Sequence, residues 1–323
     1  MKDQVECVPM HMYPPQILGC EIVSSTHVHD KRQSFKGLTI LCNDSPKWAV
    51  FILKGENMTR LFVDGKEIAI NDFYGMIPDG APTHNNVFRG QNLGALNATH
   101  IANIQNGTFR DMFIGDYFSI NGSNYVIAGI NYKRGHGDNI SLGNHLLLMP
   151  DRLSKLDDGT VLRPNGKDTH YMNDTDTTAG GFANTKLYKT YMPSIQRKLE
   201  ADFGSHLLNF REIISTHVDE SGAPDQAEWR DAKVGIPGEV MVYGTILNGN
   251  NKNGSWYNVG DDTTQLPLFR LNPEESNNHR DSAFWLRDIH SASGFADAGS
   301  GGGAYWAGAS FPWVGVRAFF LIG

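Results

Sequence analysis

The chain has 323 residues, of which 40% are hydrophobic and 20% charged, so it carries enough apolar material for one large domain or two ordinary ones. Its formal net charge of −7 argues against a protein that binds nucleic acid or an anionic membrane, since both need a basic surface. No apolar run approaches the roughly 20 residues that cross a bilayer, and no signal peptide is expected.

The three cysteines, Cys7, Cys20 and Cys42, all lie in the early part of the chain. An odd number of cysteines without a C-x-x-C spacing predicts neither a disulfide framework nor a zinc site. The chain also has 35 glycines, and a glycine-rich composition favours tight turns and short strands over long helices. We therefore expect no metal, no cofactor and a fold built largely from short strands.

Residues 1–85 are predicted to form a β-rich domain. Short runs rich in β-branched residues are typical of strands, and three occur here, at 17–25, 37–42 and 48–53. The strongest signal is TRLFVDGKEIAI, where Asp64-Gly65 suits the two positive-φ positions of a type I′ hairpin. The loop-like stretch MIPDGAPTHNN follows, and we place the domain boundary in it, at residue 85.

The next segments are predicted to mix helices and strands. A short helix is expected at 97–107, with Asn97 or Thr99 as its N-cap. A second hairpin is expected to turn at Asn121-Gly122. The run NHLLLMPD, residues 144–151, predicts a buried strand.

The clearest helix is predicted at 185–204. In it an apolar residue recurs every four positions and forms one stripe: Leu187, Tyr191, Ile195, Leu199 and Phe203. Pro193 either kinks this helix or marks its true start. The run 205–214 suits a helix or a strand equally, and 239–247 predicts another strand. Because strands and helices do not alternate strictly, the expected fold class is α+β, with residues 86–323 forming an α+β module.

No sequence pattern for a nucleophile elbow, a P-loop or a zinc peptidase occurs. GSGGG at 299–303 lacks the lysine of a phosphate-binding loop, so a glycine-rich surface loop is expected. His27 and His29 could share a strand face and hold a metal, yet no carboxylate or thiol stands at metal spacing. The remaining candidate ligands are better explained as structural histidines or solvated acidic loops: His136, His145, His279, His290, Asp157-Asp158, 173–178 and Asp261-Asp262.

Aromatic residues crowd the end of the chain. Trp285 is expected in the core, because FWLR at 284–287 predicts a strand. Other rings stand among Gly, Ala and Ser, where flat aromatic side chains can stack on sugars or anchor protein partners. The candidate ligand-binding residues are Phe295, Tyr305, Trp306 and Trp313.

The C-terminal pattern resembles the second half of C-type-lectin-like folds carried by phage tail-tip and bacterial surface proteins. Phe284, Trp285, Leu286 and Arg287 match a "WWLRS"-type strand, and Gly315, Val316 and Arg317 match a "GVRP"-type strand, with Ala318 in place of the proline. The resemblance makes Trp285, Arg287, Gly315 and Arg317 fold-defining residues. It implies that 291–310 is a displayed loop, and that the last strand pairs beside FWLR.

A longer resemblance covers about residues 86–323. NVFRGQNLG, IQNGTFRDMFIGDYFSING, HLLLMPD, TTAGGF and LPLFRLNP, in this order, look like a family of virion proteins from phages and prophages of Firmicutes. The chain also looks faintly like formylglycine-generating enzymes, which need a reactive cysteine in the lectin-like domain. All three cysteines here lie outside that part, so this activity is not implied.

Three functions follow as hypotheses. The first is a non-enzymatic virion structural protein, located in the virion and assembled in the host cytoplasm. It would dock through residues 1–85 as a homo-oligomer with other virion proteins, and bind a host surface glycan or protein or decorate the particle. The second is a core tail, baseplate or head subunit that binds only its neighbours. The third is a carbohydrate-active enzyme in which Asp288, Asp297 and the acidic runs could supply a carboxylate pair. None involves nucleic acid or membrane insertion.

Overall fold

The computed structural model describes residues 20–30, 33–42, 50–55, 58–63, 66–68, 74–164, 170–250, 264–280 and 282–323. It divides the chain into two compact units, Met1–Pro78 and Asp79–Gly323. The division falls before residue 85, because helix α2 (Ala81–His84) packs within the second unit. His84 stacks on Phe113 with ring centroids 4.4 Å apart, and its Nδ1 lies 2.9 Å from the Met112 carbonyl oxygen.

The described part of the first unit consists of two small antiparallel sheets. One pairs β1 with β2 and the other has the order β3-β4-β5; the bounds are Cys20–Asp30, Gln33–Cys42, Val50–Gly55, Met58–Val63 and Lys66–Ile68. Val63 pairs with Lys66, so β4 and β5 form the predicted hairpin with a two-residue connection. The turn residues Asp64-Gly65 themselves lie outside the described residues.

A six-stranded sheet holds the core of the second unit. Its order is β12-β16-β9-β8-β7-β6, and β6 and β7 are its parallel pair. The bounds are Asn92–Gly94 (β6), Tyr117–Ile120 (β7), Ser123–Ile130 (β8), Leu146–Pro150 (β9), Val234–Gly235 (β12) and Phe319–Ile322 (β16). The predicted hairpin at Asn121-Gly122 is confirmed, since both residues have the positive φ angles (48° and 70°) that a type I′ turn requires.

The last strand does not pair where the resemblance placed it. Phe319–Ile322 lies between β9 and β12, while Gly315 alone forms a bridge to Phe284. The physical reason is burial: all four residues of β16 and the first four of β9 are buried, so both faces of these strands need cover. A central position in the large sheet provides it. The prediction of a buried strand at 144–151 is confirmed.

The two predicted helices are confirmed. Helix α3 (Ala98–Gln105) begins after Asn97, whose side chain accepts the His100 N–H at 3.0 Å. Helix α4 (Met192–Phe203) follows a π-helical turn, η3 (Leu187–Tyr191), and the five residues of the apolar stripe are buried. Pro193 lies in the first turn of α4, where the π-helical turn η3 passes into the α-helix.

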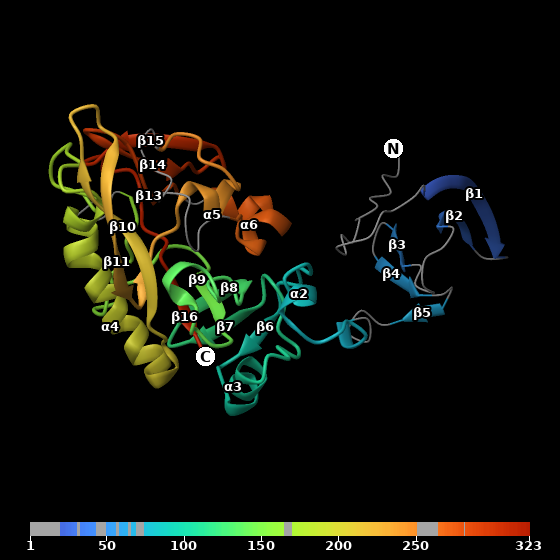
Figure 1. The fold of residues 1–323 in the computed structure, drawn as a ribbon. Coiled ribbons are helices and arrows are strands. Elements are labelled where there is room, and N and C mark those ends of the chain that lie inside the picture. Colours follow the sequence, from blue (N-terminus) through green and yellow to red (C-terminus); the bar gives the residue numbers. More distant parts are fainter. Residues whose placement is uncertain are drawn as a thin grey trace. The chain divides into compact units, whose positions relative to one another are not determined.

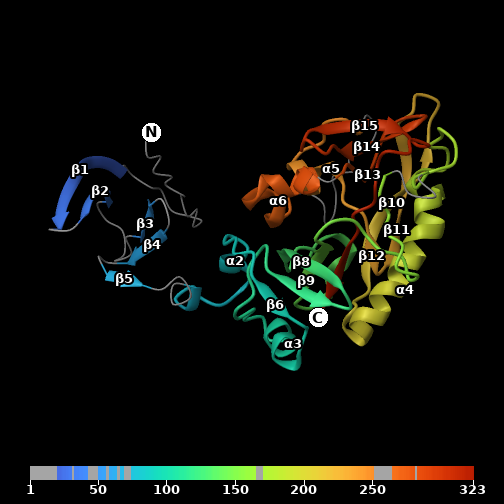
Figure 2. The ribbon, with the colours of Figure 1, turned by 180° about the vertical axis from the view of Figure 1, so that it is seen from behind.

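Segment 205–214, which the sequence left open between helix and strand, contains the start of β10. Strand β10 (Phe210–Val218) pairs with β11 (Pro224–Ala232) in a two-stranded ribbon. Figures 1 and 2 show α4 beside this ribbon. Lys233, just after β11, forms an ion pair with Glu200 of α4 at 2.9 Å.

The strand predicted at 239–247 is wrong, since helix α5 (Glu239–Tyr243) lies there. Tertiary contacts override the β-branched composition. The Glu239 N–H donates to Asp288 Oδ2 at 2.7 Å, and Gly244 ends the helix with a left-handed φ of 77°. A second short helix, α6 (Pro267–Leu271), follows in sequence.

The last sheet replaces most of the predicted display loop. Strands β13 (Phe284–Ser291), β14 (Gly294–Ala298) and β15 (Ala304–Gly308) form an antiparallel meander in that order. Residues 291–310 are therefore largely strand, because the central strand β14 is buried at every position. Figures 1 and 2 show this sheet at the opposite end of the second unit from the six-stranded sheet. The structure thus has the expected mixed α+β character, with several sheets and few helices.

Candidate functional site

An open cavity of about 550 Å³ is lined by residues between Ala283 and Val314. We call it the aromatic cavity. Its lining comes from the residue before β13, from β14, β15 and the turn between them, and from the segment after β15: Ala283, Asp297, Gly299, Ser300, Gly301, Tyr305, Trp306, Ala307, Gly308, Phe311, Trp313 and Val314. Strands β14 and β15 and the turn that joins them supply most of these residues, so the geometry of this hairpin sets that of the site.

Four aromatic side chains in this lining are exposed to solvent. The exposed fractions are 59% for Tyr305, 49% for Trp306, 45% for Phe311 and 55% for Trp313. The structure therefore brings three of the four predicted ligand-binding residues into one cavity. Phe311 was not among them, although it stands near Trp313 in the same small-residue surroundings.

Phe295, the fourth predicted ligand-binding residue, belongs to the core instead. It is fully buried, and its ring lies edge-on to Phe182 with centroids 6.4 Å apart. Phe295 pairs with Ala307 across the sheet, on the opposite side from Trp306, which pairs with Ala296. The sequence could not separate these rings, because the strands were not predicted there.

Trp306 and Tyr305 are held in place by packing. The Trp306 ring stacks on His290 with centroids 4.2 Å apart, and His290 Nδ1 donates to the Asn248 carbonyl at 2.7 Å. The Tyr305 ring lies so close to the β14–β15 turn that a Cβ at Gly299 would come within 2.6 Å of it. The GSGGG stretch is thus a tight turn under a tyrosine, closed by a 2.9 Å hydrogen bond from the Gly299 N–H to the Gly303 carbonyl.

Phe311 follows a turn that Asp176 fixes. Asp176 Oδ1 accepts the N–H and the hydroxyl of Ser310 at 2.8 and 2.7 Å. These hydrogen bonds hold the pKa of the Asp176 carboxyl below its usual value. Residues 174–176 of the acidic run 173–178 are exposed, as the sequence predicted, and Asp176 also stabilises the cavity rim.

Asp297 is the acidic member of the lining. It is 5% exposed and lies directly opposite Tyr305 in the β14–β15 ladder. Burial, and then the charge of Glu239, raise the pKa of Asp297 to about 7. A group with this pKa exchanges its proton near neutral pH and can serve as an anion or as a hydrogen-bond donor.

Asp288, the other predicted carboxylate, does not line the cavity. It is buried and accepts the N–H of Glu239, and its burial raises its pKa to about 6. No signal in the sequence indicated the role of Glu239. Its carboxylate accepts three backbone N–H groups, from Leu247, Asn248 and Gly249, at 2.8 to 3.0 Å. Asp288 and Glu239 therefore anchor α5 and the segment after it.

Three of the four predicted fold-defining residues lie around the three-stranded sheet. Trp285 is fully buried opposite Asp297, and its indole N–H has no hydrogen-bond partner in the described structure. Arg287 forms an ion pair with buried Glu212 at 2.7 Å. A Cβ at Gly315 would come within 2.8 Å of Leu153 and of a backbone oxygen, so only glycine suits this position.

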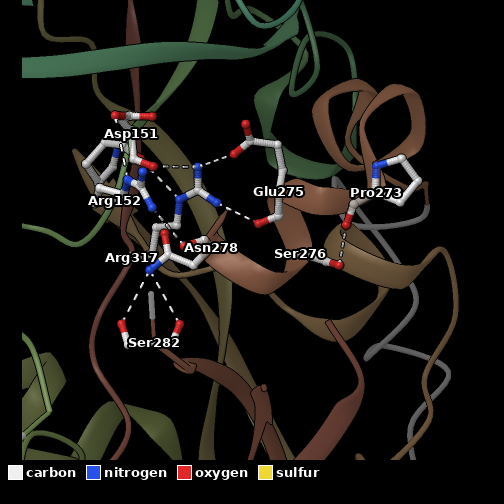
Figure 3. A network of polar contacts seen from close by, with 9 residues as sticks. Asp151, Arg152, Pro273, Glu275, Ser276, Asn278, Ser282 and Arg317 are labelled. Carbon is white, nitrogen blue, oxygen red and sulfur yellow. Dashed lines mark hydrogen bonds and ion pairs between the residues drawn. The ribbon is translucent and has the colours of Figure 1, made fainter. Parts of the chain in front are cut away.

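The fourth fold-defining residue, Arg317, is buried at the centre of a polar network (Figure 3). Its guanidinium donates to the side chain and the carbonyl of Glu275, at 2.7 and 2.8 Å, and to the Pro150 carbonyl at 3.1 Å. Asn278 donates to Ser282 in the same network at 3.4 Å. Arg317 thereby ties the segment before β13 to the end of β9.

Other candidate ligands have structural roles. His145 is buried, its Nδ1 faces the Gly143 carbonyl, and burial lowers its pKa to about 4. Asp157 pairs with Arg197 at 2.5 Å. His27 and His29 lie on β1, while Asp261, Asp262 and the His279 side chain lie outside the described residues. Where the structure is described, no three His, Cys, Asp or Glu residues gather as metal ligands, and no helix has the length and apolar character of a membrane span.

Comparison with known proteins adds no relative. No family model, no curated protein and no solved structure matches the chain. The resemblances to lectin-like tail-tip proteins and to phage virion proteins stay predictions. The geometry of the aromatic cavity is the structural observation that bears on function.

Proposed function

We propose that the chain is a non-enzymatic virion structural protein that presents the aromatic cavity at the particle surface, where it binds a glycan of the host surface. The observation that supports this most is the convergence of Tyr305, Trp306, Phe311 and Trp313, all exposed, on one cavity. The virion context comes from the sequence resemblance, and the binding role comes from the cavity.

Exposed aromatic rings around one cavity favour a binding role because water solvates them poorly. Most large apolar side chains of a folded protein are buried, and a group of exposed rings is typical of a recognition surface. Flat rings bind the apolar faces of sugars at low entropic cost, because each ring has few rotatable bonds. Stacking of Trp306 on His290 pre-orients that ring and lowers this cost further.

The carbohydrate-active enzyme is the weaker alternative. Glycoside hydrolysis uses two carboxyl groups that flank the scissile bond. In the described lining Asp297 is the acidic residue, while Asp288 is buried beneath α5 and bonded to its backbone. A single carboxyl group supports binding better than hydrolysis.

Co-sedimentation with cell walls tests the binding role. The intact chain is mixed with Gram-positive walls, peptidoglycan with its attached polymers, and the bound fraction is measured. We expect the wild type to sediment with the walls, and the double variant Trp306→Ala/Trp313→Ala to lose at least tenfold in affinity. Ile140→Ala is the matched control, because Ile140 is 81% exposed and lies outside the cavity lining.

Two results would contradict the binding role. One is a wild type that stays in the supernatant at all wall concentrations. The other is a double variant that binds as well as the Ile140→Ala control while keeping its folded circular-dichroism spectrum.

A further inference from the structure

Asp297 is a buried carboxylate without a counter-charge in the described structure. It has no hydrogen-bond or ion-pair partner among the described residues, although it is 5% exposed and lines the aromatic cavity. The carboxylate of Glu239 acts on the Asp297 carboxylate electrostatically, and the two charges have the same sign. Buried charges in proteins are ordinarily paired, because an unpaired one loses its hydration without compensation.

The groups around Asp297 favour the binding of a positively charged ligand in the cavity. On α5, Glu239 and Tyr243 act on Asp297, and Asp288 of β13 lies next to Glu239. On β15, Tyr305 lies directly opposite Asp297. His290 of β13 lies behind the Trp306 ring, and the described lining contains no Lys or Arg.

The aromatic rings add a second attraction of the same kind. The faces of Trp and Tyr rings carry negative electrostatic potential and attract cations within about 6 Å. The described lining contains four exposed aromatic residues and one carboxylate. Rings with a carboxylate suit an organic cation, whose apolar groups contact the rings while its charge faces the acid.

A metal ion does not suit the same cavity. Calcium and magnesium need several oxygen ligands, and transition metals need several His, Cys or carboxylate groups. The cavity offers one carboxylate, and three potential ligands do not gather anywhere in the described ranges. The geometry therefore selects an organic cation over a metal.

We propose that the aromatic cavity binds an organic ammonium group, with Asp297 as its counter-ion and Tyr305 and Trp313 as its walls. The inference rests on the proposed function, since it takes the cavity as the ligand site. It narrows the ligand to a surface glycan that carries an ammonium substituent.

The proposal predicts a pH dependence with a defined sign. The cation needs an ionised Asp297, and the pKa of that carboxyl is about 7. Between pH 8 and pH 6 its ionised fraction falls about tenfold, so the affinity for a permanent cation falls by about tenfold as well. Replacing Asp297 by Asn removes this dependence, whereas a dependence that arises elsewhere in the protein would persist in the variant.

Isothermal titration of the full chain with two isosteric probes tests the proposal. Choline carries a quaternary ammonium at every pH, and 3,3-dimethylbutan-1-ol has the same shape with carbon in place of nitrogen. We expect choline to bind at least tenfold more tightly than the alcohol at pH 8, and Asp297→Asn to remove that preference. The comparison of pH 8 with pH 6 uses the wild type, so it stays informative if the variant fails to fold.

Equal affinity for the two probes would overturn the proposal, as would a preference for choline that Asp297→Asn or pH leaves unchanged. The wall-binding assay separates this failure from that of the proposed function. If neither probe binds but wall binding still depends on Trp306 and Trp313, the ligand is a neutral glycan and the binding role stands. If wall binding is also independent of the two tryptophans, both proposals fail.

Discussion

Two tryptophans show how residues of one type take opposite roles in the same small sheet. Trp285 is fully buried on β13, whereas Trp306 is half exposed on β15. The difference follows from burial, because five of the eight residues of β13 are buried whereas one of the five residues of β15 is. The sequence predicted the burial of Trp285 from its strand context, and the structure confirms it. The binding role of Trp306, inferred from its small neighbours, stays a prediction.

Replacing Trp285 by Ala is expected to destabilise the protein by about 3 to 5 kcal/mol, because it leaves a large cavity in the core. Trp306→Ala should cost about 1 kcal/mol or less, since its ring is half exposed. Trp285→Phe is the control, because it keeps most of the ring and removes the unpartnered indole N–H. Urea unfolding measures all three, and equal losses for Trp285→Ala and Trp306→Ala would contradict these positions.

Asp297→Asn is expected to stabilise the protein at alkaline pH. The native pKa of about 7 lies above the ordinary value of 3.8, so the unfolded chain loses its proton first as pH rises. The native state is therefore penalised progressively between pH 3.8 and 7, and fully above pH 7. The variant should match the wild type near pH 4 and exceed it at pH 8 by up to roughly 4 kcal/mol. Urea unfolding of both proteins at pH 4 and pH 8 measures this effect. The same difference in unfolding free energy at the two pH values would contradict the burial of Asp297.

The elements of the fold were predictable where the signal is local. Asn121-Gly122 predicted the β7–β8 hairpin because both residues tolerate positive φ. The apolar stripe, which recurs every four residues, predicted α4 because one face of this helix is buried. Helix α5 could not be predicted, since hydrogen bonds to Asp288 and from residues 247–249 form only in the folded chain. The start of β13 was predicted at FWLR, but β14 and β15 were missed. Their small residues carry little strand propensity, and burial fixes β14 only in the folded chain.

Substitutions in the Arg317–Glu275 ion pair test how strongly the segment before β13 depends on one interaction. Both residues are buried, and their charged groups lie 2.7 Å apart. Glu275→Gln should cost about 3 to 5 kcal/mol, because it leaves a buried guanidinium without a counter-charge. The double variant Arg317→Met/Glu275→Leu should recover part of this loss. Additive losses in the thermal unfolding of the single and double variants would show that the two residues act independently.

At the scale of the whole molecule, the chain combines two compact units, and the candidate site lies entirely in Asp79–Gly323. A chain starting at Asp79 is expected to fold and to stay monomeric, because the second unit holds its own core. The full chain should form oligomers through the first unit, whose small sheets leave edge strands to pair. Sedimentation velocity compares the two chains, and an oligomeric shortened chain would move assembly to the second unit.

The most direct test of the central claim is an electron-microscopy map of the phage particle at side-chain resolution. The account predicts density for this chain on the particle, with Met1–Pro78 against neighbouring subunits and the rings of Tyr305, Trp306 and Trp313 facing solvent. A cavity covered by a neighbouring subunit would contradict surface binding and favour a core subunit that binds only its neighbours. Absence of the chain from the particle would contradict the virion role altogether.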